Sequence, residues 1–448
     1  MPLSERNTPM PDLSGPDLGN VGPAGLNLSS VSALSALLDK RETTSTAIVE
    51  ACLARIAARD GDVHAWQHID PDAALAQARA RDVEPRRGPL HGIPVGIKDI
   101  FDTWDMPTTY GSPIYRGFQP STDTAAVGLL RHAGAVILGK CVTTEFASPV
   151  PAGTRNPHDL TRSPGVSSSG SAAAVADFMV PLALGSQTGG STILPASFCG
   201  VVGYKASLTG IDRGGIRHLR PTLDTMGLFA RGIEDIALLR AALTGHAPSP
   251  AATRVDGPVR IGVCHTLDWA QAEPASQRAL ESARVSLGRA GAEIVDAQMP
   301  QAFKGLADSF RVISTVEGQR ALATEARDHG ATLNHYIKAA AETVAKLAPG
   351  AYDKAELHAI SAKRALADVF NRCDVIITPA ACGEAVADLV SVSNSAFNRL
   401  WTLMHGPCVS IPAFTGPNGM PVGLQVIGPP GTDDRTIALA GWIWERLR

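Results

Sequence analysis

The sequence predicts an α/β fold, built as a single large domain with a central mixed β-sheet flanked by helices on both faces. From about residue 30 onward, short apolar stretches alternate with longer segments of helical periodicity, a pattern typical of a sheet covered by helices. Aromatic residues make up only 5% of the chain and alanine is abundant, which suits helices packed on a sheet. No internal repeat or clear linker divides this region.

The first segment differs from the rest. Residues 1–28 are rich in proline and glycine and poor in large apolar residues, which predicts a flexible or surface-draped arm. Residues 29–448 form the predicted domain. It begins with apolar residues at helical spacing between Val31 and Leu38 and again between Ile48 and Ile56. Residues 43–45 offer N-caps for the second of these helices.

Further elements follow from the same patterns. A short helix is expected around residues 123–132 and an alanine-rich one over 172–176, and residues 246–258 resemble a surface connection. Longer helices are expected at about 274–291, across 303–371 and from about 434. The expected strands are the apolar runs at residues 93–97, 135–138, 180–184, 260–264, 374–378, 409–412 and 422–427.

Composition and motifs exclude several classes of protein. The net charge is −3, so no basic field favours nucleic acid or an anionic membrane. The seven cysteines include no CxxC pair, which argues against zinc and disulfides and for a reduced, cytoplasmic protein. No secretory signal or long apolar run is present. Residues 134–140 approach a P-loop pattern, but Cys141 replaces its Ser or Thr. We therefore expect no metal and no cofactor.

Two glycine-rich blocks carry the candidate chemistry. Ser167 lies in the first and Ser191 in the second, 24 residues later. Glycines allow backbone N–H groups to converge on one point, and serine is a common nucleophile beside such donors. No GxSxG elbow is present. Lys98 ends an apolar strand and can act as a base if burial keeps it neutral. By spacing alone, a strand-end ion pair of Lys98 with Asp99 or Asp102 is the favoured interpretation.

Several long motifs together resemble the amidase signature family, and the resemblance runs from about residue 30 to the C-terminus. Bacterial malonamidase-like members look most similar, because their surroundings at residues 111–115 and 398–403 are alike. The motifs are GIPVGIKDI at 92–100, GVSSSGSAAAVA at 165–176, GGS at 189–191, FCGVVGYK at 198–205 and PVGLQVIG at 421–428.

The resemblance implies the amidase signature fold and a Ser–cis-Ser–Lys triad. Ser191 would be the nucleophile, Ser167 would follow a cis peptide and relay the proton, and Lys98 would be the base. The implied oxyanion hole consists of the backbone N–H groups of Thr188, Gly189, Gly190 and Ser191. The neighbouring Ser168 is expected to support the site or cap a helix, as are Ser169 and Ser171.

Three departures from the family pattern stand out, and Leu194 bears on specificity. Val166 replaces a commoner glycine. Gln187 stands where many members have aspartate, and Leu194 stands where arginine is usual. Leucine offers neither charge nor donor, which favours a pocket for neutral substrates. The alternative is that Leu194 only packs beneath the nucleophile loop. Phe146, Phe198 and Trp401 are further candidates for the pocket, although each also fits the core.

The predicted function is a serine hydrolase that cleaves C–N bonds of neutral aryl or aliphatic amides through an acyl-enzyme. Carbamates (urethanes) and esters are further candidate substrates, because they share a tetrahedral intermediate. One alternative is a glutamine-hydrolysing A-type subunit of an amidotransferase. The other is a non-catalytic binding protein on an amidase fold. A small-molecule substrate is the expected partner, and a homodimer is a candidate assembly.

Overall fold

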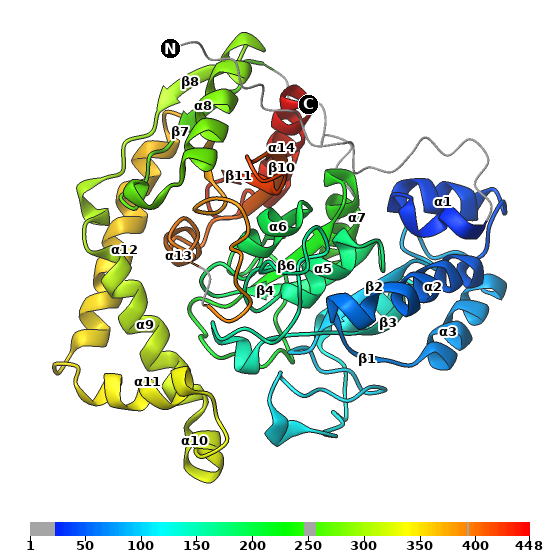
Figure 1. The fold of residues 1–448 in the computed structure, drawn as a ribbon. Helices are drawn as coiled ribbons and strands as arrows, with labels where there is room; N and C mark the ends of the chain where they lie inside the picture. The colour runs from blue at the N-terminus through cyan, green and yellow to red at the C-terminus, as the bar shows by residue number, and fades with distance from the viewer. Residues whose placement is uncertain (1–22, 246–256, 392–393) are drawn as a thin grey trace.

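One mixed sheet runs through the protein, as the sequence predicts. The computed structural model describes residues 23–245, 257–391 and 394–448 (Figure 1). Within them, eleven strands form a single sheet in the order β1-β3-β2-β4-β6-β5-β10-β11-β9-β7-β8. The strands are β1 (Trp66–Ile69), β2 (Pro94–Lys98), β3 (Val136–Cys141), β4 (Leu182–Gln187), β5 (Val202–Lys205), β6 (Thr225–Ala230), β7 (Arg260–Val263), β8 (Glu293–Asp296), β9 (Val375–Pro379), β10 (Cys408–Thr415) and β11 (Pro421–Ile427).

Parallel pairs lie on either side of an antiparallel middle, and the edge strand β1 pairs antiparallel with β3. β2 runs parallel to both of its neighbours, β3 and β4, and β7 runs parallel to β8 and β9. The pairs from β4 through β6, β5, β10 and β11 to β9 are antiparallel. β2 and β4, which carry Lys98 and lead to Ser191, are therefore adjacent parallel strands.

Helices cover both faces of this sheet. α5 and α6 pack on one face, and α4, α7, α8 and α14 on the other. The helices are α1 (Val31–Asp39), α2 (Ser45–Val63), α3 (Pro71–Val83), α4 (Ala125–His132), α5 (Ser169–Ala176), α6 (Ile193–Cys199), α7 (Ile233–Thr244), α8 (Pro274–Arg289), α9 (Leu306–Ala321), α10 (Ala323–His329), α11 (His335–Ala345), α12 (Ala351–Phe370), α13 (Arg399–Leu403) and α14 (Asp433–Leu447).

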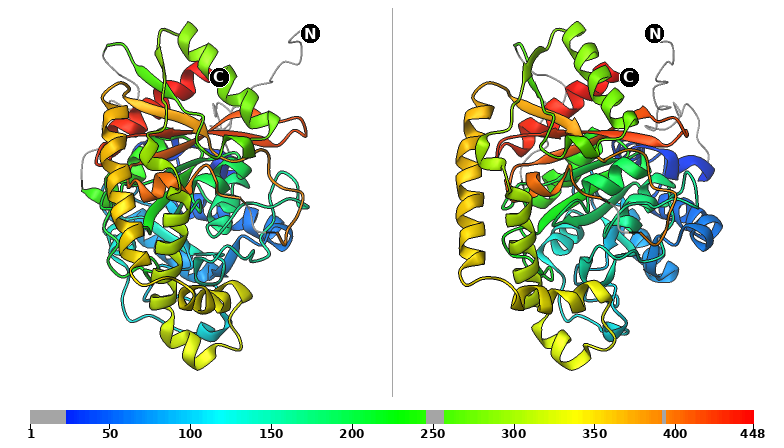
Figure 2. Two further views of the ribbon diagram at one scale, coloured as in Figure 1. Left: turned by 90° about the vertical axis from the view of Figure 1, so that its left-hand side faces the viewer. Right: turned by 60° about the vertical axis from the view of Figure 1, so that its left-hand side comes forward.

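The helical region expected over residues 303–371 forms a column at one side of the molecule. Figure 2 shows α9 and α12 side by side, with α10 and α11 at the lower end. Several elements have no counterpart among the predicted ones, including β1, α3, β5, β6, α6, α7 and β8. The chain turns between α10 and α11, so α11 packs against α9.

The boundary of the N-terminal segment differs from the expected one. Pro23–Leu28 forms a 3₁₀ helix, and Leu26 is buried in the main core with Val31 and Leu34. Burial of Leu26 and hydrogen bonds of Asn27 to Phe178 and Arg231 hold residues that composition alone assigned to an arm. Residues 1–22 lie outside the described residues, as does most of the expected connection at 246–258. The predicted N-cap is confirmed at Thr44, whose hydroxyl accepts a hydrogen bond from Ala47 N at 3.1 Å.

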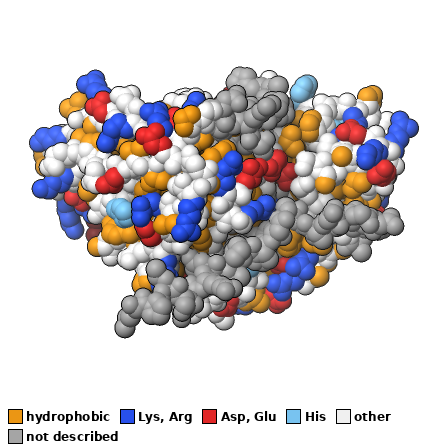
Figure 3. All heavy atoms as spheres, turned by 90° about the horizontal axis from the view of Figure 1, so that it is seen from above, with side chains coloured by type: hydrophobic (Ala, Val, Ile, Leu, Met, Phe, Trp, Pro, Cys, Tyr) orange, Lys and Arg blue, Asp and Glu red, His pale blue; other side chains and the backbone are white. Residues whose placement is uncertain are grey.

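The surface carries charges of both signs. Figure 3 shows basic and acidic side chains interspersed on the face seen from above. No helix among the described residues is long and apolar enough to cross a membrane.

Candidate active site

Lys98 is buried where β2 meets the start of α5. Val95 and Ile97 point into the main core, so strand alternation directs Lys98 to the opposite face, which α5 covers. The Lys98 side chain is 0% exposed. Its Nζ lies 2.8 Å from Ser167 Oγ, 3.0 Å from Ser168 Oγ and 2.9 Å from Ser186 Oγ. The structure thus brings Lys98 and Ser167 together.

Two glycines make this close approach possible. Gly165 has φ +108°, and a Cβ there would lie 2.7 Å from Pro195 Cα. A Cβ on Gly185 would lie 2.9 Å from Ser168 Oγ. Both positions exclude any larger residue, because real Cβ atoms do not approach other atoms so closely. The glycine-rich sequence is therefore required to seat the serines over the lysine.

Ser168 is hydrogen-bonded to the backbone of β4. Its hydroxyl donates to Ser186 O at 3.1 Å and accepts from Ser186 N at 3.2 Å. It stands at the N-cap of α5 but forms no capping hydrogen bond, so of the two expected roles, support or capping, its contact with Lys98 fits support. Its oxygen accepts instead from Ser186 N and from Lys98 Nζ. Ser171 donates to Leu184 O at 2.8 Å and also ties α5 to β4.

Burial decides the protonation of Lys98. Desolvation lowers the pKa of Lys98 from 10.5 to about 7, and the carboxylate of Asp224 acts in the opposite direction. Neither ion pair favoured by spacing alone forms among the described residues: Asp99 pairs with Lys140 at 3.1 Å, and Asp102 accepts from Tyr110 OH at 2.7 Å. Lys98 Nζ is therefore surrounded by neutral serine hydroxyls. They offset only part of the cost of burying its positive charge.

Ser191 lies in the connection between β4 and α6 and is 8% exposed. The side chain of Gln187 shapes this connection. Its Oε1 accepts from Thr192 N at 2.9 Å and Ile193 N at 3.0 Å, and its Nε2 donates to Thr402 Oγ1 at 3.0 Å. Gln187 thus caps the first turn of α6 from within the loop, a task that a neutral amide performs without adding charge near Lys98.

The four backbone N–H groups of the implied oxyanion hole lie in this same loop. Among the described residues, no hydrogen-bond acceptor is found for the N–H groups of residues 188–191. The hydroxyl of Thr188 donates to Asp224 Oδ1. A Cβ on Gly190 would lie 2.8 Å from Asn398 Oδ1, so the loop passes tightly against the segment before α13. Within the described part of the chain, no hydrogen bond joins Ser191 to Ser167.

One backbone expectation is wrong. The described residues contain no cis peptide bond, so the peptide before Ser167 is trans. The turn comes instead from the positive φ of Gly165, and Ser167 still lies next to Lys98.

The candidate pocket residues fall into separate clusters. Leu194 and Phe198, on α6, pack with Val166. Trp401 on α13 packs with Phe303 at a ring-centroid distance of 6.5 Å, and Phe146 belongs to the main core. All four side chains are buried. The structure therefore brings Leu194 and Phe198 together beside the residue that precedes Ser167, while Phe146 and Trp401 lie in other clusters.

Two polar residues of the site are not apparent from the sequence. Ser186 contacts Lys98 and lies in the second glycine-rich block, which is a signal that could have identified it. Asp224 binds Thr188 and opposes the lowering of the pKa of Lys98. Nothing in its local pattern distinguishes it from other loop acids.

Comparison with known proteins is consistent with this arrangement. The pattern of the family described as Amidase matches residues 47–437. The chain belongs to the amidase family. This amidase is 35% identical to the A subunit of the glutamyl-tRNA(Gln) amidotransferase of Acidothermus cellulolyticus, over 90% of its own length and 91% of the relative's. The predicted family is confirmed.

Solved structures show the same fold. The native peptide amidase of Stenotrophomonas maltophilia is 29% identical, with a TM-score of 0.78, and the match covers 94% of this amidase and 97% of that chain. A structure described as part of a vestigial complex that reveals the origins of an s-triazine catabolic enzyme is 28% identical. Its TM-score is 0.85, and the match covers 93% of this amidase and 98% of that chain. The amidase signature fold is thus confirmed over almost the whole chain.

Proposed function

We propose that this amidase hydrolyses the C–N bond of neutral amides through an acyl-enzyme on Ser191, with Ser167 as proton relay and Lys98 as base. The observation that carries the proposal is the buried Lys98 amine, 2.8 Å from Ser167 Oγ. With its pKa lowered to about 7 by burial, about half of the lysine is neutral at pH 7 and ready to accept a proton.

Acylation begins when Ser191 Oγ bonds to the carbonyl carbon. Its proton passes to Ser167 Oγ while the proton of Ser167 passes to Lys98 Nζ. Ser168 does not compete for this role, because its proton is held by Ser186 O. The electron pair of the carbonyl moves to oxygen, where the N–H groups of residues 188–191 would stabilise it. The loss of one such donor typically lowers turnover on the order of 10²–10³-fold.

Collapse of this intermediate releases the amine. The proton returns from Lys98 through Ser167 to the leaving nitrogen as the C–N bond breaks. Water then attacks the acyl ester on Ser191, using the same relay, and releases the acid with the serine restored. Carbamates and esters pass through the same type of intermediate and are further candidate substrates.

The preference for neutral substrates rests on the surroundings of Leu194. Its side chain is 0% exposed and packs among apolar side chains that include Phe198 and Met420. Leucine at this position itself offers no charge or donor to hold a carboxylate on the acyl group. We propose Leu194 and Phe198 as the residues that shape this side of the pocket, with Phe146 and Trp401 as outer candidates.

Hydrolysis of 4-nitroacetanilide, a neutral aryl amide, tests the mechanism. Ser191→Ala is expected to abolish acylation, and Ser167→Ala to lower turnover by several orders of magnitude. Ser169→Ala is the matched control and should retain activity, because Ser169 lies in the same glycine-rich block but is not among the serines that Lys98 Nζ contacts. Hydrolysis by Ser191→Ala at the unmodified rate would disprove the nucleophile. Faster hydrolysis of an amide with a carboxylate on its acyl group would disprove the neutral preference.

A second candidate is glutamine hydrolysis as the A-type subunit of an amidotransferase. The 35% identity to such a protein over 90% of this chain favours it. Leu194 counts against it, because leucine offers no ion pair for a charged substrate. Glutamine hydrolysis that exceeds hydrolysis of neutral aryl amides, and that rises with an added partner protein, would favour this candidate instead.

A further inference from the structure

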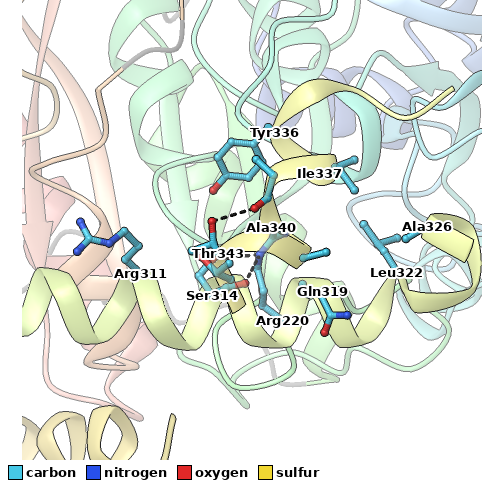
Figure 4. A pocket seen from close by; sticks show the side chains of 14 residues that line it. Arg220, Arg311, Ser314, Gln319, Leu322, Ala326, Tyr336, Ile337, Ala340 and Thr343 are labelled. Atoms are coloured by element: carbon cyan, nitrogen blue, oxygen red, sulfur yellow. Dashed lines mark hydrogen bonds between the residues drawn. The ribbon is translucent and has the colours of Figure 1, made fainter. Parts of the chain in front are cut away.

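A cavity of about 200 Å³ lies between α9 and α11. Its lining residues do not include Lys98 or the serines that Lys98 contacts. Most of its wall is apolar. Figure 4 shows Leu322, Ala326 and Ile337 toward one end, while Arg220 lies beside Ser314 and Ala340 near the middle. The cavity is thus lined mostly by small and aliphatic side chains, with the buried guanidinium of Arg220 among them.

No acid among the described residues forms an ion pair with Arg220. Its side chain is 8% exposed, and its Nε donates to Ser314 Oγ at 3.1 Å and Ser314 O at 3.3 Å. Among the described residues, neither of its terminal nitrogens donates a hydrogen bond and no ion pair includes it. The guanidinium therefore presents two adjacent donors to the cavity.

Two acids near Arg220 in the fold are engaged elsewhere. Glu317, on α9, accepts from Thr222 Oγ1 at 2.6 Å and from Tyr352 OH at 2.8 Å. Asp224 Oδ2 accepts from the backbone N–H groups of residues 219 and 220 at 2.9 and 2.8 Å. Arginines this buried are almost always paired, because an isolated charge is poorly solvated inside a protein. An anion that enters the cavity would supply the missing partner.

We propose that this cavity binds a carboxylate carried on an apolar aryl or alkyl group. The carboxylate would accept two parallel hydrogen bonds from the terminal nitrogens of Arg220, and the apolar group would lie against Leu322 and Ile337. The proposal goes beyond the proposed function, because it concerns a separate site and does not require hydrolysis.

The site is linked to the candidate oxyanion loop through one side chain. Asp224 binds the backbone of Arg220 with one oxygen and Thr188 with the other. A ligand on Arg220 is therefore placed to affect the loop that precedes Ser191. The carboxylate could belong to a separate small molecule or to the far end of a substrate, and both sources share the same recognition chemistry.

Calorimetric titration of the full chain tests the site with three probes. Phenylacetate has both the charge and the apolar group, 2-phenylethanol lacks the charge, and acetate lacks the apolar group. We expect phenylacetate to bind most tightly. Arg220→Met should weaken phenylacetate binding by about 10- to 100-fold, the usual effect of losing hydrogen bonds to a charged group. Arg220→Lys should recover only part of the affinity, because lysine lacks the planar fork.

Arg311→Met is the matched control. Arg311 lines the same cavity but is exposed and paired with Asp308, so its loss should leave the affinity unchanged. Circular dichroism shows whether each variant folds. Equal binding of 2-phenylethanol and phenylacetate to the unmodified chain would overturn the proposal even if Arg220→Met fails to fold. Unchanged phenylacetate binding by a folded Arg220→Met would overturn it as well.

Inhibition kinetics with 4-nitroacetanilide separate the two sources of carboxylate. Non-competitive effects of phenylacetate would identify a separate ligand. Competitive inhibition that depends on Arg220 would place the carboxylate on the substrate, and would contradict the neutral preference while leaving the binding site intact. A failure of the proposed function is thus distinguishable from a failure of this site.

Discussion

The acidic limb of the pH–rate profile should report the titration of Lys98. Burial lowers its pKa from 10.5 to about 7, which corresponds to about 5 kcal/mol of lost stabilisation of the charged form. At pH 7 about half of the lysine is then neutral, against roughly one molecule in three thousand at the usual pKa. Because only neutral Lys98 can accept a proton, kcat/KM should fall about tenfold per pH unit below pH 7.

The assay is the initial rate of hydrolysis of 4-nitroacetanilide between pH 5 and 9, at substrate concentrations below KM. This substrate does not titrate in that range, so the limb belongs to the free enzyme. Asp224→Asn provides the perturbation. Since the Asp224 carboxylate raises the pKa of Lys98, its removal should move the limb to lower pH. Asp212→Asn is the control, because Asp212 is an exposed acid in the same loop.

Two outcomes would refute this reasoning. A profile that stays flat from pH 8 to pH 5 would show that no group with a pKa near 7 must lose a proton. If the limb moves to higher pH in Asp224→Asn, the pKa of the titrating group is not raised by the Asp224 carboxylate, unlike the pKa of Lys98. Either result would remove Lys98 from the role of base.

Two further predictions concern residues around the loop. Ser186→Ala removes a hydroxyl 2.9 Å from Lys98 Nζ that accepts from the ammonium, so the acidic limb should move to lower pH, measured by the same profile; a shift to higher pH would contradict this contact. Gln187→Ala removes the acceptor for Thr192 N and Ile193 N and should lower the free energy of unfolding by about 1–3 kcal/mol. Urea denaturation measures that loss, and an unchanged midpoint would disprove the capping role.

Strong apolar runs made much of the sheet predictable. β2, β7, β9 and β11 lie within one residue of such a run at each end, because a strand buried on both faces is mostly apolar. β3 and β4 run on past the apolar residues into buried polar ones, which the pattern did not include. β1 and β8 are four-residue strands with mixed polarity, and so short a stretch shows little period. α6 contains Pro195 near its start, a residue that breaks helices elsewhere but is tolerated in a first turn.

The residues of the candidate site also fall into two groups, those that the sequence signalled and those that it did not. The glycine-rich blocks identified Ser167 and Ser191, because tight turns and close approaches require glycine locally. Ser186, Asp224 and Arg220 gave little or no signal of this kind. Their importance depends on which side chains lie next to them, and those neighbours come from distant parts of the chain.

The sequence by itself determined the family and much of the sheet that carries the candidate site, and its motifs predicted roles for the two serines and the lysine. Only the tertiary structure decided that Asp99 pairs with Lys140, which leaves Lys98 among hydroxyls with its pKa lowered. It also decided that Arg220 faces a cavity and forms no ion pair with any acid among the described residues. The physical reason is that motifs record local backbone requirements, whereas the solvation and pairing of a charge depend on groups brought together by folding.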